Sequence, residues 1–196
     1  MVWNKSRLEK TIYLTFDDGP IPEVTPWVLK TLKAYNANAT FFCIGDNIQK
    51  NPEIFAQLKA DGHTTGNHTQ NHLKGWAVAD EIYLDNIRKC SQWMESDLFR
   101  PPYGRIKRSQ IREIQNSKFK IQNGDQTLKI IMWDVLSGDF DIDLSPEKCL
   151  QSVLKKTSNG SIIVFHDSLK AWERLEYVLP KALEFWQKEG YSFGVL

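Results

Sequence analysis

The stretch TIYLTFDDGP, residues 11–20, decides the fold. Its first six residues are rich in β-branched and aromatic side chains, which is typical of a strand. The remaining four residues, Asp17, Asp18, Gly19 and Pro20, favour a turn, so the strand has to end there. The stretch therefore predicts a strand that runs directly into a loop carrying two adjacent carboxylates.

Segments with strand and helix patterns alternate about seven times along the chain. Further strands are expected at residues 39–44, 63–67, 129–135, 161–165 and 191–196. Helices are expected at residues 25–35, 51–61, 79–96, 106–117, 145–159 and 169–189. Three of these helices should begin with a cap residue followed by proline: Thr25-Pro26, Asn51-Pro52 and Ser145-Pro146. The alternation favours an α/β fold in which parallel βα units close, or nearly close, into a barrel.

Length and composition define the class of protein. At 196 residues the chain is long enough for one full-sized core, which predicts a single domain spanning residues 1–196. Apolar residues at 41% and charged residues at 25% are typical of a soluble globular protein rather than a disordered or fibrous one. The net charge of +1 comes from balanced basic and acidic residues. Neither nucleic acid nor a membrane is therefore an expected partner, and a monomer is the default.

Two further features concern location and cysteine chemistry. The first ten residues lack the continuous apolar run of a signal peptide, and no run approaches membrane-spanning length. We therefore expect a cytoplasmic protein, although an exported protein with a trimmed signal would look similar. Cys43, Cys90 and Cys149 stand far apart without a Cys-x-x-Cys pair, so we expect packing residues rather than disulfide partners or metal ligands. The polar stretch 119–127 is expected to be an exposed loop.

The most reactive side chains fall just after expected strands. They are Asp17, Asp18, His68, Arg100, Asp139 and His166. In a barrel of parallel strands, the loops after the C-terminal strand ends gather on one face, and active sites lie there. We therefore expect these side chains to meet at the C-terminal mouth of the strands.

Two histidines and one carboxylate form a candidate metal site. His68 and His72 are four residues apart, which on a helical turn places them on one face with about 5–6 Å between their Cβ atoms. Histidines at this spacing are more often surface residues, but Asp18 from a separate strand end adds a third ligand. Two imidazoles and a carboxylate leave coordination positions open, as in catalytic sites. We expect one divalent cation, with Zn²⁺ as the first choice and Co²⁺, Ni²⁺ or iron also suited to these ligands.

Other side chains are candidates for proton transfer and its support. Asp17 is an ordinary turn residue on its own, but beside a metal-polarised water it could act as general base. His166 is either a core histidine or a general acid, which a carboxylate such as Asp139 would keep protonated. Arg100 lies in a loop stiffened by two prolines and is either a solvated turn residue or a clamp for a carboxylate. Such a set would suit hydrolysis of an amide, which needs a proton delivered to the leaving nitrogen.

Four short motifs occur in the order in which a known family carries them. They are TFDDGP at 15–20, HTxxH at 68–72, RPPYG at 100–104 and His-Asp at 166–167, supported by ATFF at 39–42 and GNH at 66–68. On these motifs the chain resembles the polysaccharide deacetylases, also called carbohydrate esterase family four or the NodB-homology domain, over essentially its whole length. The resemblance implies a distorted (β/α) barrel of about seven parallel strands with outer helices.

The resemblance implies roles for the residues of the first three motifs. Asp17 would be the catalytic base, and Arg100 would orient it. Asp18, His68 and His72 would bind the metal. These implied roles agree with those that the residue types suggest.

The resemblance also implies how the reaction is completed. The backbone N–H of Tyr103 would help the metal to stabilise the oxyanion, while Asp139 would tune His166 as the acid. The implied reaction is attack of metal-activated water on the acetyl carbonyl of an N-acetylated, or in some members O-acetylated, sugar. Acetate would be released from an acetylated carbohydrate substrate.

The expected substrate pocket departs from the family pattern. Pro101, Pro102, Phe140 and Val164 would line it. The family's fourth motif is usually Asp-x-x-Asp-Trp, and here Leu136 replaces the first Asp and Phe140 replaces the Trp. Val164 stands where the family usually has Leu against the acetyl methyl group. Because these changes touch the pocket wall and not the metal ligands or proton carriers, the identity of the substrate stays open.

Two other functions remain as alternatives. A metal hydrolase of the same fold could act on a small non-sugar amide, which the missing Trp and export signal favour. A catalytically silent carbohydrate-binding module could have kept the fold, although such a module would usually have lost the base or a metal ligand. Trp76, Trp133 and Trp172 are candidates for stacking on sugar rings, and core packing would explain them equally well.

Overall fold

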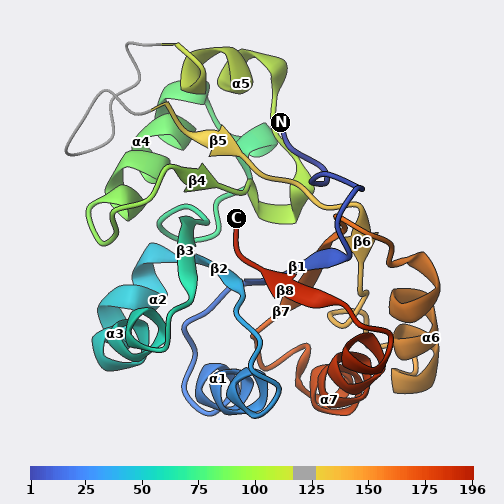
Figure 1. The fold of residues 1–196 in the computed structure, drawn as a ribbon. Helices are drawn as coiled ribbons and strands as arrows, with labels where there is room; N and C mark the ends of the chain where they lie inside the picture. Colours follow the sequence, from blue (N-terminus) through green and yellow to red (C-terminus); the bar gives the residue numbers. More distant parts are fainter. Residues whose placement is uncertain (117–126) are drawn as a thin grey trace.

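The framework of the fold is a sheet of parallel strands curled into a half-barrel (Figure 1). A computed structural model describes residues 1–116 and 127–196. The strands follow the order β5-β4-β3-β2-β1-β7-β6, and β8 pairs with β1. Their bounds are β1 Thr11–Asp17, β2 Thr40–Cys43, β3 Thr64–Asn67, β4 Leu98–Phe99, β5 Lys129–Ile130, β6 Val135–Leu136, β7 Ile162–His166 and β8 Ser192–Gly194. All pairings between these strands are parallel, and the predicted α/β barrel class is confirmed.

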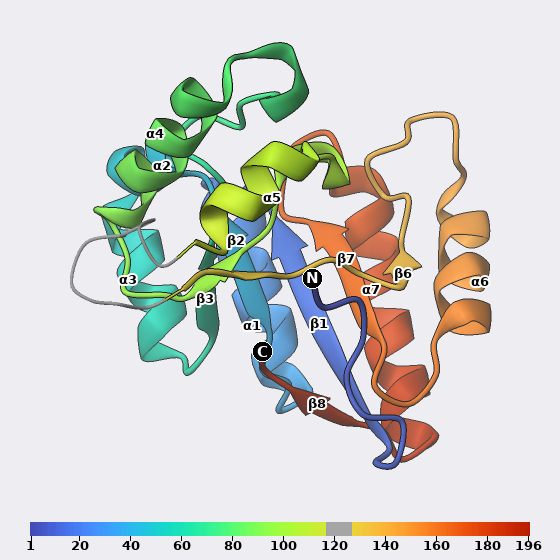
Figure 2. The ribbon, with the colours of Figure 1, turned by 90° about the horizontal axis from the view of Figure 1, so that it is seen from above.

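Helices cover the outside of the half-barrel (Figure 2). They are α1 Val24–Ala34, α2 Gly45–Lys50, α3 Pro52–Ala60, α4 Asp80–Ser91, α5 Arg108–Ile114, α6 Pro146–Lys156 and α7 Trp172–Lys188, with short 3₁₀ turns at Gly75–Ala77 and Pro102–Gly104. Ile12, Leu14 and Phe16 of β1 are fully buried in one cluster with apolar side chains of α1 and α7. Burial of this cluster provides the main driving force that holds the helices on the sheet.

The opposite face of β1 points into the half-barrel, because successive side chains of a strand alternate between faces. Tyr13 packs there against a second apolar cluster, made of Phe42, Leu98, Ile131 and Ile162. Asp17, four residues after Tyr13 on the same face, ends the strand, where it is paired with Phe42 of β2 and His166 of β7. The register of the sheet therefore brings Asp17 and His166 to the same end of neighbouring strands.

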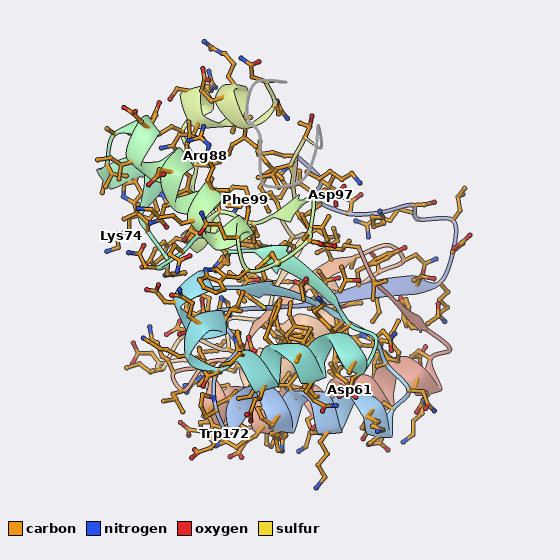
Figure 3. All side chains as sticks on the ribbon, turned by 90° about the vertical axis from the view of Figure 1, so that its left-hand side faces the viewer. Asp61, Lys74, Arg88, Asp97, Phe99 and Trp172 are labelled. Atoms are coloured by element: carbon orange, nitrogen blue, oxygen red, sulfur yellow. The ribbon has the colours of Figure 1, made fainter. Side chains whose placement is uncertain are left out.

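The C-terminal ends of the strands gather on one side of the molecule, as predicted for a barrel of parallel strands. In Figure 3, Lys74 and Trp172, which follow β3 and β7, lie toward one side of the domain. Asp61 and Asp97, which precede β3 and β4, lie toward the other side. The loops that follow the strands are thus free to build a shared site.

The stretch 129–135 is not the single strand that its sequence predicted, because its backbone bonds in turn to three different segments. The N–H of Ile131 donates to the carbonyl of Phe99 in β4 at 2.8 Å, whereas the N–H of Met132 donates to Val2 near the N-terminus at 2.7 Å. The N–H of Asp134 then donates to Ile162 of β7 at 3.2 Å. The stretch therefore forms β5 and β6 with a bent connection that joins the two edges of the half-barrel.

The three predicted helix caps have different outcomes. Ser145 is confirmed as the cap of α6, since its hydroxyl accepts a backbone N–H of the first turn at 3.3 Å. Asn51 precedes α3, but its side chain donates to two carbonyls and does not cap the helix. The prediction for Thr25 is wrong, because α1 begins at Val24 and the Thr25 hydroxyl donates to Asp167 at 2.6 Å.

Other expectations are met only in outline. The remaining predicted helices are present but shorter. Helix α2 was not predicted, and a strand was expected before Arg100, where β4 lies, but without bounds. Almost all of the predicted loop 119–127 lies outside the described residues. The three cysteines are free and buried, as expected of packing residues. Among the described residues, no helix is both long and apolar enough to span a membrane.

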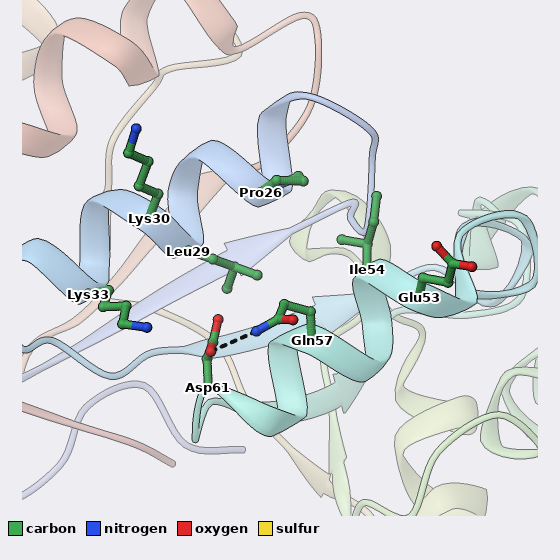
Figure 4. A pocket seen from close by; sticks show the side chains of 8 residues that line it. All are labelled: Pro26, Leu29, Lys30, Lys33, Glu53, Ile54, Gln57 and Asp61. Carbon is green, nitrogen blue, oxygen red and sulfur yellow. Dashed lines mark hydrogen bonds between the residues drawn. The ribbon is translucent and has the colours of Figure 1, made fainter.

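A groove lies on the outer surface between α1 and α3 (Figure 4). Leu29 of α1 and Ile54 of α3 point into it, and Gln57 bridges to Asp61 along its edge by a hydrogen bond of 2.8 Å. No histidine or cysteine is present among its eight lining residues. The chemistry-bearing side chains lie instead at the strand ends.

Candidate active site

A cavity of about 460 Å³ opens at the C-terminal ends of the strands. Its lining residues are Asp17, Asp18, His68, His72, Tyr103, Trp133, Leu136, Phe140, His166, Ser168 and Lys170. Two further residues named from the sequence, Arg100 and Asp139, are fully buried behind this wall. The structure thus brings the predicted reactive side chains together around one cavity.

Asp18, His68 and His72 converge on one point of the cavity wall. One ligand atom from each lies within 4.8 Å of the others, with 3.8 Å from Asp18 Oδ1 to His68 Nε2 and 3.4 Å to His72 Nε2. Asp18 Oδ1 is buried and accepts no hydrogen bond from any described residue. His68 Nδ1 donates to the carbonyl of Arg100 at 2.8 Å, which leaves Nε2 with its lone pair toward the cluster. The donor set and the unpaired carboxylate oxygen fit a divalent cation.

Burial keeps the two imidazoles in the form that binds metals. It lowers the pKa of His68 to about 4 despite the nearby Asp17 and Asp18 carboxylates. Burial likewise lowers the pKa of His72. Both side chains are therefore neutral at physiological pH, so a cation has no proton to displace from them.

The loop that carries His68 and His72 is not the helical turn that their spacing predicted. Thr69 and His72 have φ values of 67° and 57°, in the left-handed region. Asn67 holds this irregular backbone, because its Oδ1 accepts the N–H of Thr69 at 2.8 Å while its Nδ2 donates to the carbonyl of Ile87 at 2.9 Å. The loop that carries the two histidines is therefore held by the fully buried amide of Asn67 and not by a helical turn.

The backbone around Asp18 is held by contacts that the sequence did not reveal. Asp18 has a φ of 90°, and its carbonyl accepts a hydrogen bond from Asn47 at 2.7 Å. The next N–H, of Gly19, donates to Asp167 at 3.0 Å, and a Cβ at Gly19 would collide with the same carboxylate. Burial raises the pKa of Asp167 to about 8, although its bond from Thr25 opposes that rise. These residues come from separate elements, so no local pattern identifies them.

Asp17 is paired with a cation on the buried side. Arg100 Nη1 donates to Asp17 Oδ1 at 2.7 Å and to the hydroxyl of Thr15 at 2.7 Å. Its remaining donors bond to the carbonyls of Ile131 and Met132 at 3.3 and 3.0 Å. Burial lowers the pKa of Arg100, but the adjacent carboxylate works against that change. Arg100 thus fixes one oxygen of Asp17 while the carboxylate still lines the cavity.

His166 is paired with a carboxylate on the buried side. Its Nδ1 lies 2.8 Å from Asp139 Oδ1, and its backbone N–H donates to Asp139 Oδ2 at 2.8 Å. The hydroxyl of Ser137 also donates to Oδ1, at 2.9 Å. Burial alone would lower the pKa of His166, but the charge and hydrogen bond of Asp139 raise it to about 9. At neutral pH, His166 is therefore protonated and faces the cavity.

Tyr103 occupies the mouth of the cavity. Its φ of 61° is left-handed, and among the described residues no acceptor pairs with its backbone N–H. The ring lies 4.5 Å from the His72 ring and 5.3 Å from the Trp76 ring. Of the other candidate tryptophans, Trp133 lines the cavity, whereas Trp172 packs against Trp27.

Only one of the four expected pocket residues lines the cavity. Phe140 does so, with its ring 5.0 Å from the ring of His166. Pro101 and Pro102 are buried within the loop that presents Tyr103, and Val164 is fully buried two residues before His166 in β7. Leu136, expected as a change in the pocket wall, also lines the cavity, whereas Ser168 and Lys170 line it without having been named from the sequence.

Known proteins share sequence with this chain over most of its length. The model of the family described as polysaccharide deacetylase matches residues 4–121. The chain is 34% identical over 199 residues to a peptidoglycan-N-acetylglucosamine deacetylase of Bacillus cereus, covering 98% of this chain and 89% of that protein. It is 36% identical over 166 residues to a chitooligosaccharide deacetylase of Azorhizobium caulinodans, covering 81% and 74%.

A crystal structure of a peptidoglycan N-acetylglucosamine deacetylase has the same fold. It matches with a TM-score of 0.85 and 28% identity over 100% of this chain and 90% of that one. The chain therefore belongs to the polysaccharide deacetylase family, the hydrolases of carbohydrate esterase family four that share the NodB-homology domain.

Proposed function

We propose that this chain is a metal-dependent deacetylase that removes acetyl groups from N-acetylated carbohydrates such as peptidoglycan or chitooligosaccharides. The observation that carries the proposal is the grouping of a metal-ligand set, a carboxylate and a protonated histidine around one cavity. The names of the two relatives, which describe deacetylases of these glycans, support the substrate class.

The metal ligands would be Asp18, His68 and His72. A divalent cation bound by them, with Zn²⁺ preferred and Co²⁺ or Ni²⁺ also suited, would polarise a water molecule and the acetyl oxygen. The buried, unpaired Oδ1 of Asp18 supports this assignment, because an unpaired carboxylate oxygen is costly unless a cation binds it.

The proton carriers would be Asp17 and His166. Arg100 bonds Oδ1 of Asp17, so the other oxygen can take a proton from the attacking water. Asp139 bonds Nδ1 of His166, so Nε2 can give a proton to the leaving nitrogen. The unpaired N–H of Tyr103 would donate to the developing oxyanion.

An acetate-release assay tests this function. Chelated protein, with zinc or cobalt then added, is supplied with chitooligosaccharides, peptidoglycan, acetylxylan and small acetamides. Metal-dependent release from the N-acetylated glycans is expected. Release from small acetamides alone would instead support the non-sugar hydrolase, and binding of glycan without any release would support the silent module.

The metal assignment has its own test. His68→Ala should lower the bound metal measured by elemental analysis, because it removes one of three ligands. His63→Gln is the matched control, since His63 is also buried but accepts a backbone N–H from Ala39 outside the cavity. Unchanged metal content in His68→Ala would refute the ligand set.

A further inference from the structure

One wall of the cavity carries a cation that the proposed reaction does not use. Lys170 lines the cavity, with its Nζ 5.9 Å from the centre of the Phe140 ring. Ser168, two residues earlier, lines the same wall. Within residues 1–116 and 127–196, no carboxylate forms an ion pair with Lys170, and the Ser168 hydroxyl has no hydrogen-bond partner. The wall therefore presents an ammonium group and a hydroxyl that are both available to a ligand.

A buried arginine fixes the backbone of this wall. Arg174 of α7 is 4% exposed, and its Nε donates to the carbonyl of Asp139 at 2.7 Å. Its Nη2 donates to the carbonyl of Lys170 at 2.8 Å. Because Phe140 directly follows Asp139, one guanidinium fixes the backbone on both sides of the Phe140–Lys170 contact. Lys170 is therefore part of a built wall rather than of a free surface loop.

Among the cavity residues that the structure describes, no acidic side chain is left to neutralise Lys170. The two carboxylates in the lining are Asp17, which pairs with Arg100 at 2.7 Å, and Asp18, which belongs to the metal-ligand set. Leu136 is 37% exposed in the lining and adds no charge. With a divalent cation bound, the cavity would carry net positive charge, which attracts an anionic substrate group.

We propose that Lys170 selects acetylated sugars that carry a carboxylate close to the acetamido group. Its ammonium binds that carboxylate while the acetyl group lies beside the Asp18–His68–His72 set. The inference rests on the proposed function and names its preferred substrate class, an acidic glycan rather than a neutral one. A charge-assisted hydrogen bond at an exposed side chain is partly screened, so the expected preference is about tenfold in kcat/KM.

The test compares three oligosaccharides of equal length that differ in one substituent. One contains N-acetylmuramic acid, whose lactyl group supplies a carboxylate; the second is its methyl ester; the third is a chitooligosaccharide. The unmodified protein should have a kcat/KM about tenfold higher on the acid than on the ester or the chitooligosaccharide, and high salt should reduce that ratio. Equal values for acid and ester would overturn the proposal.

Four variants separate Lys170 from general electrostatics. Lys170→Met keeps a side chain of similar length and removes the charge, so the kcat/KM for the acidic sugar should fall to that for the ester. Lys170→Arg keeps the charge and should keep most of the preference for the acid. Leu136→Asp should reduce the preference for the acidic sugar, because the new carboxylate would repel the carboxylate of the substrate. Lys30→Met, on the α1–α3 groove of Figure 4, is the matched control and should keep it. A preference that survives Lys170→Met, or an equal loss on acid and ester, would overturn the proposal.

Calorimetric measurement of binding of the same sugars tests the role of Lys170 separately from the proposed deacetylase function. If no sugar releases acetate, the proposed function fails. Tighter binding of the acid that depends on Lys170 would still support the inference, whereas equal Kd values for acid and ester would overturn it.

Discussion

Two ion pairs flank the cavity, and they are built in opposite orders. In the Asp17–Arg100 pair, the carboxylate lines the cavity and the cation is fully buried behind it. In the His166–Asp139 pair, the imidazole lines the cavity and the carboxylate is fully buried behind it. Each pair therefore presents one titratable group and hides its counter-charge.

The order of burial decides what each pair can do. A cation behind a carboxylate favours the form that accepts a proton, and a carboxylate behind an imidazole favours the form that donates one. The same kind of contact, with bonds of 2.7 and 2.8 Å, thus yields a candidate base on one side and a candidate acid on the other. Exchanging or removing the hidden partners should therefore change activity and stability differently on the two sides.

The largest effect is expected from Asp17→Asn. Asparagine can still accept the hydrogen bond from Arg100 but cannot take a proton, so kcat/KM for acetate release should fall by about 10²–10⁴-fold. Metal content should stay at the level of the unmodified protein, because the three proposed ligands are unchanged. Near-normal turnover would remove Asp17 from the role of base.

Arg100→Met tests the hidden partner of the same pair. It leaves the Asp17 carboxylate buried without its cation, and removal of one partner from a buried pair costs about 3–5 kcal/mol in the free energy of unfolding. Denaturant titration measures this loss. Arg105→Met is the control, since Arg105 is exposed and its guanidinium, within the described part of the chain, stacks only on Trp76. A loss for Arg100→Met as small as that of the control would show that the pair does not stabilise the fold.

The sequence predicted the exposed members of the two pairs better than the supports behind them. Asp17 and His166 end strands of strong β pattern, and the barrel rule places strand ends together. Arg100 and Asp139 were candidates from residue type and position with other interpretations left open, and the family motifs implied their definite roles. The strand before Arg100 has only two residues, whose pairing comes from neighbouring strands and not from a local pattern.

Contacts between residues far apart in the sequence could not be predicted from local sequence patterns. Thr25 looked like a helix cap because proline follows it, yet its hydroxyl bonds Asp167, which lies 142 residues further along the chain. The loop between His68 and His72 is left-handed at Thr69, where Asn67 accepts the backbone N–H, so spacing alone suggested a helix. Propensity and motif order therefore predicted which residues react, whereas tertiary contacts determine how they are held.

Asp139→Asn probes the hidden partner on the acid side. The raised pKa of His166, about 9 against an ordinary value of 6.5, means that turnover requiring protonated His166 should fall as pH rises through about 9. Without the Asp139 charge, burial opposes protonation more strongly, so the fall in turnover should move to lower pH. The pairing also contributes stability that is fully present below pH 6.5 and lost as pH rises through about 9. The pH profile of kcat/KM measures the first effect, and an unchanged alkaline limb would contradict it.

The smallest effect is expected from Thr15→Val, which removes one support of Arg100 without touching either pair. The Thr15 hydroxyl accepts from Arg100 at 2.7 Å and donates to the carbonyl of Ile163 at 2.8 Å in a fully buried position. Because Arg100 keeps its bond to Asp17, the loss in unfolding free energy should be about 1–2 kcal/mol, with less than about a tenfold change in acetate release.

Thr31→Val is the matched control for that variant, since the Thr31 hydroxyl is only partly buried and bonds the carbonyl of Trp27 within its own helix. Its effect on the free energy of unfolding should stay within about 0.5 kcal/mol. If Thr15→Val were instead as damaging as Arg100→Met, the hydroxyl and not the ion pair would hold Asp17 in place. The two sides of the cavity would then differ in how their reactive groups are held, and not only in which charge is hidden.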